Sequence, residues 1–156
     1  MDDRAYLLQA VEKARKTMQE NLGGPFGALL VDDQGEVFIA SNTVLGSHDP
    51  TAHAEVNVIR QACKEKGTHD LSGSILYTTC YPCPMCLSAC IWANIKQVYY
   101  GCTPQDAQAI GFRDDFIYRY INRGCSDASV LSLHQSDRSA CLPLFEEYQA
   151  MDKELY

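Results

Sequence analysis

Residues 74–86, SILYTTCYPCPMC, join an expected strand to the start of an expected helix and place cysteines at the junction. Residues 74–79 are rich in apolar, aromatic and β-branched side chains, which are typical of a strand. Pro84 suits the first turn of a helix, because its missing N–H has no partner to lose there. Cys83 and Cys86 therefore lie three positions apart in a first turn, a spacing at which two thiolates reach one zinc ion. The positive end of the helix dipole also favours the thiolate form.

Helices and strands alternate on both sides of this segment. The periodicity of apolar residues predicts helices over 3–20, 53–66, 84–94, 114–122 and 142–155, and further strands over 26–31, 36–41, 97–102 and 130–134. Such alternation predicts an α/β fold, a sheet with helices on both faces. The chain has 156 residues and no linker-like stretch, so we expect a single domain over 1–156.

A second motif, PTAHAEV at 50–56, places His53 and Glu55 at the start of another expected helix. Both side chains are costly to bury unless something pairs with them. Combined with Cys83 and Cys86, His53 completes three ligands for one zinc ion per subunit and leaves the fourth position to a water or hydroxide nucleophile, as in catalytic zinc sites. Glu55 is then the catalytic base that takes a proton from that water.

Composition and charge restrict the partner and the compartment. The net charge is −7, so a nucleic-acid partner is not expected and a small molecule is. No apolar run approaches the ~20 residues needed to cross a bilayer, and no membrane association is expected. The first twenty residues lack the features of a secretory signal. The eight cysteines are therefore expected to be reduced thiols in a cytoplasmic protein.

Together these motifs resemble the cytidine/deoxycytidylate deaminase superfamily, the zinc nucleobase deaminases, and within it the small bacterial guanine deaminases. The resemblance covers essentially the whole chain and is carried by GGPFGALLV (23–31), DPTAHAEVNVIRQAC (49–63), PCPMC (82–86), IWA (91–93), GFRDDFIY (111–118) and the final Tyr156. It implies a three-layer α/β/α cytidine-deaminase-like fold with a five-stranded mixed sheet. It also implies hydrolytic deamination of guanine to xanthine and ammonia.

The resemblance further implies roles for residues outside the zinc site. Asp114 accepts hydrogen bonds from the guanine N1–H and amine and assists proton transfer. The other substrate-binding residues implied are Phe26, Asn42, Ala54 (through its backbone N–H), Trp92 and Tyr156. In this view Tyr156 closes the site from a C-terminal segment, about 126–156, exchanged between the subunits of a homodimer.

Several of these residues also have a purely structural interpretation. Asp114 is alternatively a helix cap, or exchanges roles with Asp115 if the register slips. Asn42 is alternatively a turn residue, and Phe26 and Trp92 are alternatively core residues. Cys90 follows Cys86 by one helical turn, where a fourth thiolate would make a closed, structural zinc site. Cys80 has no assigned role.

One departure from the family pattern stands beside the metal motif. Tyr81 occupies a position where the superfamily usually has glutamate, so hydrogen bonding next to the site must differ. Competing functions are deamination of guanosine, of another aminopurine or aminotriazine, or of a tRNA adenosine. Outside the deaminases, a structural zinc module or a redox protein using CPMC shares part of the pattern.

Overall fold

The computed structural model describes residues 2–156, which divide into two compact units, one ending at Asp115 and the other formed by Phe116–Tyr156. The N-terminal unit contains a mixed four-stranded sheet with the strand order β2-β1-β3-β4. β1 (Gly27–Val31) pairs antiparallel with both β2 (Val37–Ser41) and β3 (Ile75–Cys80). β4 (Gln97–Cys102) runs parallel to β3. The strands expected in this unit all form, within two residues of their predicted ends.

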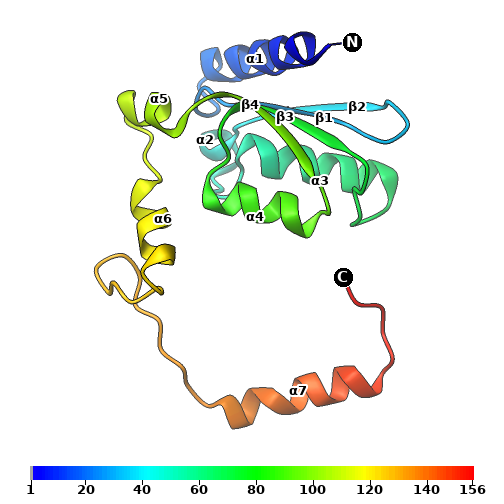
Figure 1. Ribbon diagram of the computed structural model, residues 1–156, viewed down its shortest axis with the longest axis vertical. Coiled ribbons are helices and arrows are strands. Elements are labelled where there is room, and N and C mark those ends of the chain that lie inside the picture. The colour runs from blue at the N-terminus through cyan, green and yellow to red at the C-terminus, as the bar shows by residue number, and fades with distance from the viewer. Residues whose placement is uncertain (1) are drawn as a thin grey trace. The chain divides into compact units, whose positions relative to one another are not determined.

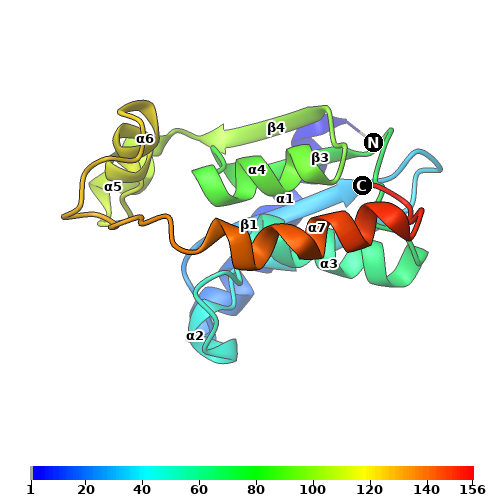
Figure 2. The same ribbon diagram turned by 90° about the horizontal axis from the view of Figure 1, so that it is seen from below.

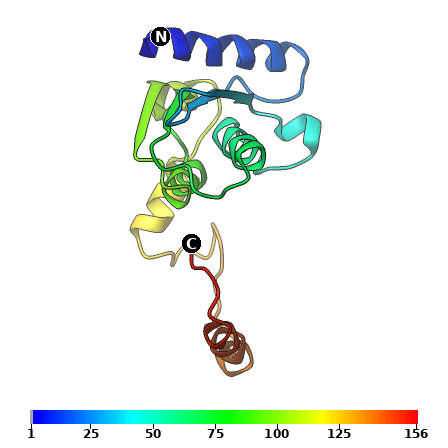
Figure 3. The ribbon, with the colours of Figure 1, turned by 90° about the vertical axis from the view of Figure 1, so that its right-hand side faces the viewer.

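Helices cover both faces of the sheet, as the alternation predicted. α1 (Asp3–Gln19) lies on one face, and α3 (Ala54–Lys66) and α4 (Pro84–Trp92) lie side by side on the other (Figures 1 and 3). Two short helices, α2 (Val44–Ser47) and α5 (Pro104–Ala109), were not predicted. All helices within residues 2–156 are too short or too polar to span a bilayer.

The alternation of side chains along each strand divides the core between the two faces. On the α3/α4 face, the buried cluster includes Leu30, Phe38 and Leu76 from the strands. On the α1 face, Leu29 and Tyr77 pack with Ala10 of α1. α1 lies so close to the sheet that a Cβ atom on Gly27 would be 2.1 Å from the Ala10 carbonyl oxygen. Gly27 is therefore required for this packing.

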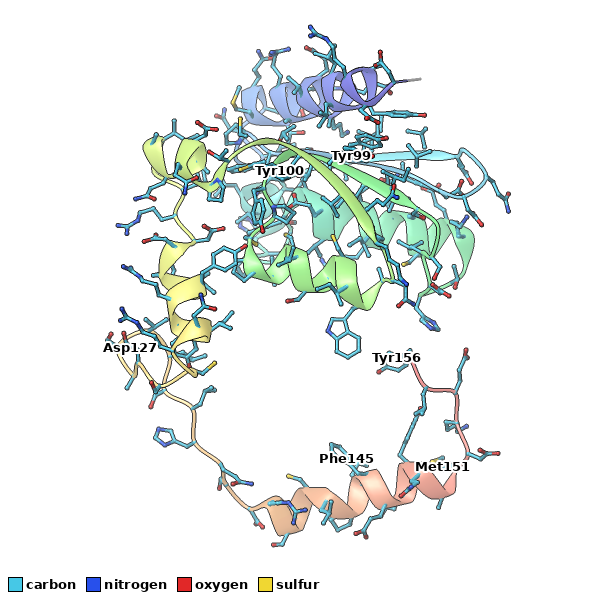
Figure 4. The ribbon with its side chains drawn as sticks, viewed as in Figure 1. Tyr99, Tyr100, Asp127, Phe145, Met151 and Tyr156 are labelled. Atoms are coloured by element: carbon cyan, nitrogen blue, oxygen red, sulfur yellow. The ribbon has the colours of Figure 1, made fainter. Side chains whose placement is uncertain are left out.

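The C-terminal unit holds α6 (Asp115–Asn122), which starts at the last residue of the first unit, and α7 (Arg138–Ala150) (Figure 2). The Tyr120 hydroxyl donates a hydrogen bond to the Leu131 carbonyl oxygen at 3.0 Å, which ties the loop after α6 to that helix. Asp137 caps α7 by accepting from the Ala140 N–H at 3.1 Å, so this helix begins four residues earlier than predicted. The α7 region leaves large apolar side chains exposed, among them Phe145 and Met151 (Figure 4).

The prediction of a fifth strand over 130–134 is wrong for the single chain. Within residues 2–156 the sheet has four strands, and residues 131–137 form no regular structure. The apolar residues Val130, Leu131 and Leu133 are exposed. A strand needs a neighbour to satisfy its backbone groups, and the C-terminal unit contains helices and loops only.

A buried carboxylate organises the turn between β1 and β2. Asp32 accepts hydrogen bonds from the Gln34 and Glu36 N–H groups at 2.9 and 2.8 Å, and the Lys66 ammonium at the end of α3 contacts its other oxygen. The Lys66 contact is the main reason that the pKa of Asp32 is lowered, against the effect of burial.

Replacing Lys66 with Met should therefore lower the midpoint of urea unfolding at neutral pH, because Asp32 would stay buried without its cation. Since the folded-state pKa of Asp32 is depressed, its contribution is full above the unfolded value near 3.8 and is lost as the pH falls through the folded value. The difference between variant and wild type should shrink over that range. Lys64→Met, on the exposed side of the same helix, is the control, and equal losses in both variants would contradict this role.

Candidate metal centre

The three predicted zinc ligands lie at the N-termini of the two neighbouring helices. His53 is the N-cap of α3, Cys83 is the N-cap of α4, and Cys86 is in the first turn of α4. The His53 side chain makes no cap hydrogen bond to its own helix and lies instead against both cysteine sulfur atoms. The ligand atoms of these three side chains all lie within 4.8 Å of one another. Within residues 2–156, they are the cluster of His, Cys, Asp or Glu side chains that could hold a metal ion.

The distances within this group fit a tetrahedral zinc ion. The Nδ1 atom of His53 lies 3.5 Å from the Cys83 Sγ and 3.6 Å from the Cys86 Sγ. Zinc–sulfur and zinc–nitrogen bonds of about 2.3 and 2.0–2.1 Å at a tetrahedral angle separate the two ligand atoms by about 3.5 Å. The ligand atoms are thus already spaced for the ion, and the donor set is that of a catalytic zinc site.

The pKa shifts of Cys83 and Cys86 favour a thiolate on Cys83 and a proton on Cys86. The Cys86 thiol donates toward the Cys83 sulfur and lowers the pKa of Cys83, with help from the His53 ring. The pKa of Cys86 is raised by the neighbouring Cys83 sulfur and by burial. The pKa of His53 is raised by its hydrogen bond with Cys83. Because metal binding must displace the proton left on this pair, zinc affinity should fall as the pH is lowered.

Glu55 projects from the first turn of α3 beside the ligands. Glu55 is only 7 % exposed and lies beside the Cys86 thiol, which acts to lower its pKa. Burial is the main reason that its pKa is raised. A carboxylate of raised pKa at a metal site can accept a proton and return it near neutral pH.

A cavity of about 600 Å³ opens from the metal ligands. Its lining includes four of the predicted residues that are not ligands: Glu55, Phe26, Asn42 and Asp114. The Phe26 ring packs edge-on against Phe112, with ring centroids 5.0 Å apart. A Cβ atom on Gly24 would be 3.1 Å from both of these rings, so glycine leaves room for this wall.

Backbone contacts fix the orientation of the Asn42 amide. Its Oδ1 atom accepts from the Val44 N–H at 3.1 Å and the Gly24 N–H at 3.4 Å. A Cβ atom on Gly23 would be 2.0 Å from the Asn42 carbonyl oxygen, so this loop passes against the asparagine only because residue 23 is glycine. Since both contacts use Oδ1, the Nδ2 group remains as the donor that Asn42 offers to a ligand.

The structure places Asp114, rather than Asp115, in the cavity lining. Burial and, next, the nearby Cys83 sulfur raise the pKa of Asp114. Asp115 forms a two-bond ion pair with Arg113 at 3.2 and 3.1 Å. Of the two aspartates, Asp114 is therefore the one that reaches the cavity, whereas Asp115 pairs with Arg113.

The other predicted residues divide between the site and the surface. Ala54 is fully buried as the first residue of α3, where its backbone N–H has no partner within the helix. Trp92 lies at the far end of α4, is 70 % exposed and does not line the cavity of this chain. Tyr156 belongs to the C-terminal unit and is exposed. Cys90 is buried in the core beneath α4, outside the ligand group.

Several lining residues were not predicted. They are Gly23, Gly24, Val44, Leu45, Pro50, Cys80, Tyr81, Pro104, Ala107, Phe112 and Arg113. Phe112 and Arg113 lie next to Asp114 in GFRDDFIY, which is the one available signal for them. Loop residues such as Leu45 carry no periodic pattern that would reveal their position. Tyr81, the departure from the family pattern, packs edge-on against Tyr100 of β4, with ring centroids 5.0 Å apart.

This geometry, a sheet with two parallel helices whose N-termini carry His, Cys and Cys, defines a class of zinc-dependent deaminases. Residues 1–102 match the cytidine and deoxycytidylate deaminase zinc-binding region. The chain belongs to that family, and the predicted zinc site is the site of the family.

Two kinds of relative are informative. Guanine deaminase from Bacillus subtilis strain 168 is 44 % identical over 130 residues, 83 % of each chain. A crystal structure of guanine deaminase from that species matches all of this chain and 99 % of its own, with a TM-score of 0.93 and 40 % identity. A tRNA-specific adenosine deaminase from Agrobacterium fabrum is 37 % identical over 101 residues, 65 % of this chain and 66 % of that protein.

Replacing Cys86 with Ser should abolish stoichiometric zinc binding, whereas replacing Cys90 with Ser should leave one zinc per chain. The first change removes a thiolate from the ligand group, and the second alters a core residue. The zinc content after dialysis against a weak chelator, measured by elemental analysis, checks both. Loss of zinc from a folded Cys90→Ser protein would instead support the closed site with a fourth thiolate.

Proposed function

We propose that the protein is a zinc-dependent hydrolase that converts free guanine and water to xanthine and ammonia. The observation that carries the proposal is one cavity lined by Glu55, Asp114 and two of the three grouped metal ligands, His53 and Cys83, with the third ligand, Cys86, beside them. The guanine deaminase from B. subtilis, similar over most of this chain, supports guanine as the substrate.

The residues divide the hydrolytic chemistry between them. His53, Cys83 and Cys86 would hold the zinc ion, which when bound would lower the pKa of a water in its open position to roughly 7 and so provide a nucleophile near neutral pH. The Glu55 carboxylate accepts a proton from the attacking water and delivers it to the substrate, so that the C2 amine leaves as ammonia. Burial holds Glu55 in place and raises its pKa, which suits both halves of this transfer.

Asp114 selects guanine. Guanine presents two donors on one edge, the N1–H and the C2 amine, and a carboxylate accepts from both. Adenine and cytosine present an acceptor at the comparable ring nitrogen, which the carboxylate would repel. A partly buried carboxylate left without a donor is costly, so the discrimination is strong.

Asn42 and Phe26 position the base. The Oδ1 contacts of Asn42 leave its Nδ2 group to donate to an acceptor on the purine ring. The Phe26 ring, supported by Phe112, offers a face for stacking. The backbone N–H of Ala54, at the start of α3, is a further donor beside the metal.

The remaining cavity volume points to a second chain. Cavities of ~300–1,000 Å³ accept drug-sized ligands, and this one, of about 600 Å³, is larger than a nucleobase needs. A second copy in a homodimer fills the remainder by placing its Tyr156 over the base. The exchanged segment is about 126–156. Each domain, 1–156, is therefore completed by the C-terminal segment of the other subunit. Trp92 contributes to the pocket only in that assembly.

The same exchange supplies the fifth strand. β4 is one of the two edge strands of the sheet and leaves Tyr99 and Tyr100 exposed (Figure 4). Residues 130–134 of the second copy pair with this edge and bury Val130, Leu131 and Leu133. Exposed edges of this kind are usually covered.

Guanosine is the alternative substrate that the cavity favours, because the volume beyond the base would accept its ribose. A tRNA adenosine is disfavoured by the net charge of −7. We place the protein in the cytoplasm, since two neighbouring zinc thiolates need a compartment that keeps them reduced.

Ammonia release from the zinc-loaded protein should be rapid with guanine and at background with guanosine, adenine and cytidine. Asp114→Asn should lower kcat/KM for guanine by about 10²–10⁴-fold, the usual contribution of a positioned proton-transfer group. Asp115→Asn, which breaks an exposed ion pair, should change it little. Rapid turnover of guanosine would contradict a pocket closed by a tail, and equal losses in both aspartate variants would contradict the role of Asp114.

Mixing two inactive variants tests the exchanged segment. Glu55→Gln lacks the proton carrier, and Tyr156→Ala lacks the residue that closes the pocket. If the tail acts in trans, co-refolded mixtures should regain roughly a quarter of wild-type activity, because a mixed dimer pairs one intact site with the intact tail of its partner. Activity no greater than that of the separate variants would show that each tail closes its own site.

A further inference from the structure

Cys80 and Cys102 are the last residues of β3 and β4 and are register partners in this parallel pair. Residues opposite each other in a parallel ladder project to the same face. Neighbouring strands lie about 4.8 Å apart, which falls within the roughly 4.4–6.8 Å between Cα atoms that a disulfide spans. The mechanism uses neither of these cysteines.

Local contacts draw the two strand ends together. A Cβ atom on Gly101 would be 3.0 Å from the Thr79 carbonyl oxygen, so glycine permits a close approach of the backbones one residue before the pair. The Tyr81 N–H donates to the Cys102 carbonyl oxygen at 2.9 Å. The Cys80 Sγ donates to the carbonyl oxygen of Thr103, the residue that follows β4, at 3.7 Å.

The two thiols differ in their access to solvent. Cys102 is exposed, whereas Cys80 is 9 % exposed. Both line a second cavity of about 330 Å³ between α1 and α5, which shares Cys80, Phe26 and Ala107 with the metal cavity. Burial, and next the neighbouring Cys102, raise the pKa of Cys80 to about 11. Cys102 also lines this cavity, so an oxidant can reach its sulfur there even where a strand pairs with the β4 edge, and Cys102 is the thiol that meets a small oxidant first.

We propose that Cys80 and Cys102 form a peroxide-oxidisable dithiol that closes to a disulfide. In the first step, the Cys102 sulfur attacks hydrogen peroxide, which breaks the O–O bond and gives Cys102 sulfenic acid and one water. In the second step, the Cys80 sulfur attacks the sulfenic sulfur, the S–S bond forms, and the hydroxyl leaves with the Cys80 proton as a second water. The two thiols together lose two electrons, and the peroxide is reduced to water.

The disulfide acts on the site through the wall that the two cavities share. Cys80 lines the metal cavity and lies three residues before Cys83. Closing the bond moves its sulfur away from the Thr103 carbonyl and toward Cys102, which alters the wall beside the substrate. Oxidation should therefore raise KM more than it lowers kcat. This effect on turnover, unlike the disulfide itself, rests on the proposed function.

Peroxide treatment of the zinc-loaded protein tests the proposal, with zinc content measured throughout. Wild type should lose two titratable thiols while retaining zinc. Peptide mapping without reductant should show one new link, between Cys80 and Cys102, that dithiothreitol reverses. Cys102→Ser should form no link and keep its activity before and after peroxide. Cys141→Ser, which removes an exposed cysteine of α7, should behave as wild type.

Two outcomes would overturn the dithiol. One is oxidation of Cys102 beyond sulfenic acid with no linked peptide. The other is a link through Cys83 or Cys86 with release of zinc. A reversible Cys80–Cys102 link in a protein that does not deaminate guanine would sustain the dithiol and count against the proposed function instead.

Discussion

The convergence of two helix N-termini is the constraint on which the site depends. α3 and α4 run side by side on one face of the sheet, and their N-caps are His53 and Cys83. This places one nitrogen and two sulfur atoms at the separation that zinc requires. The positive helix ends also favour the thiolates, so geometry and electrostatics act in the same direction. Glu55 enters the site because it follows His53 by two residues in the same first turn.

Two glycines shape the wall of the cavity around Asn42 and Phe26. Gly23 and Gly24 allow the loop before β1 to lie against Asn42 and the Phe26–Phe112 pair. Gly23 lets the loop lie against the Asn42 backbone, and the Gly24 N–H helps to hold the Asn42 amide. Gly24 also leaves room for the Phe26 and Phe112 rings. A Cβ atom at residue 23 would displace the backbone of Asn42, so the shape of the cavity depends on these small residues.

The sequence was informative wherever a local pattern specifies the structure. The zinc ligands follow from short spacings at helix starts, and β1 to β4 follow from apolar runs with turn residues between them. α5 had a readable signal in the capping box formed by Thr103 and Asp106, whereas the four residues of α2 had none. The segment 130–134 has an apolar pattern suited to a strand, but a strand needs a neighbouring edge, which local sequence cannot supply. Trp92 could not be placed either, because an aromatic residue at a helix end suits a core, a pocket or a surface equally.

The chemistry proposed for this site requires zinc to have three protein ligands and one exchangeable position. X-ray absorption at the zinc edge of the loaded protein measures this directly. We expect two sulfur atoms at about 2.3 Å and two nitrogen or oxygen atoms at about 2.0–2.1 Å, of which one is displaced when an inhibitor with a metal-binding group is added. A shell with three sulfur atoms, or one that no such inhibitor changes, would instead indicate a closed, structural site.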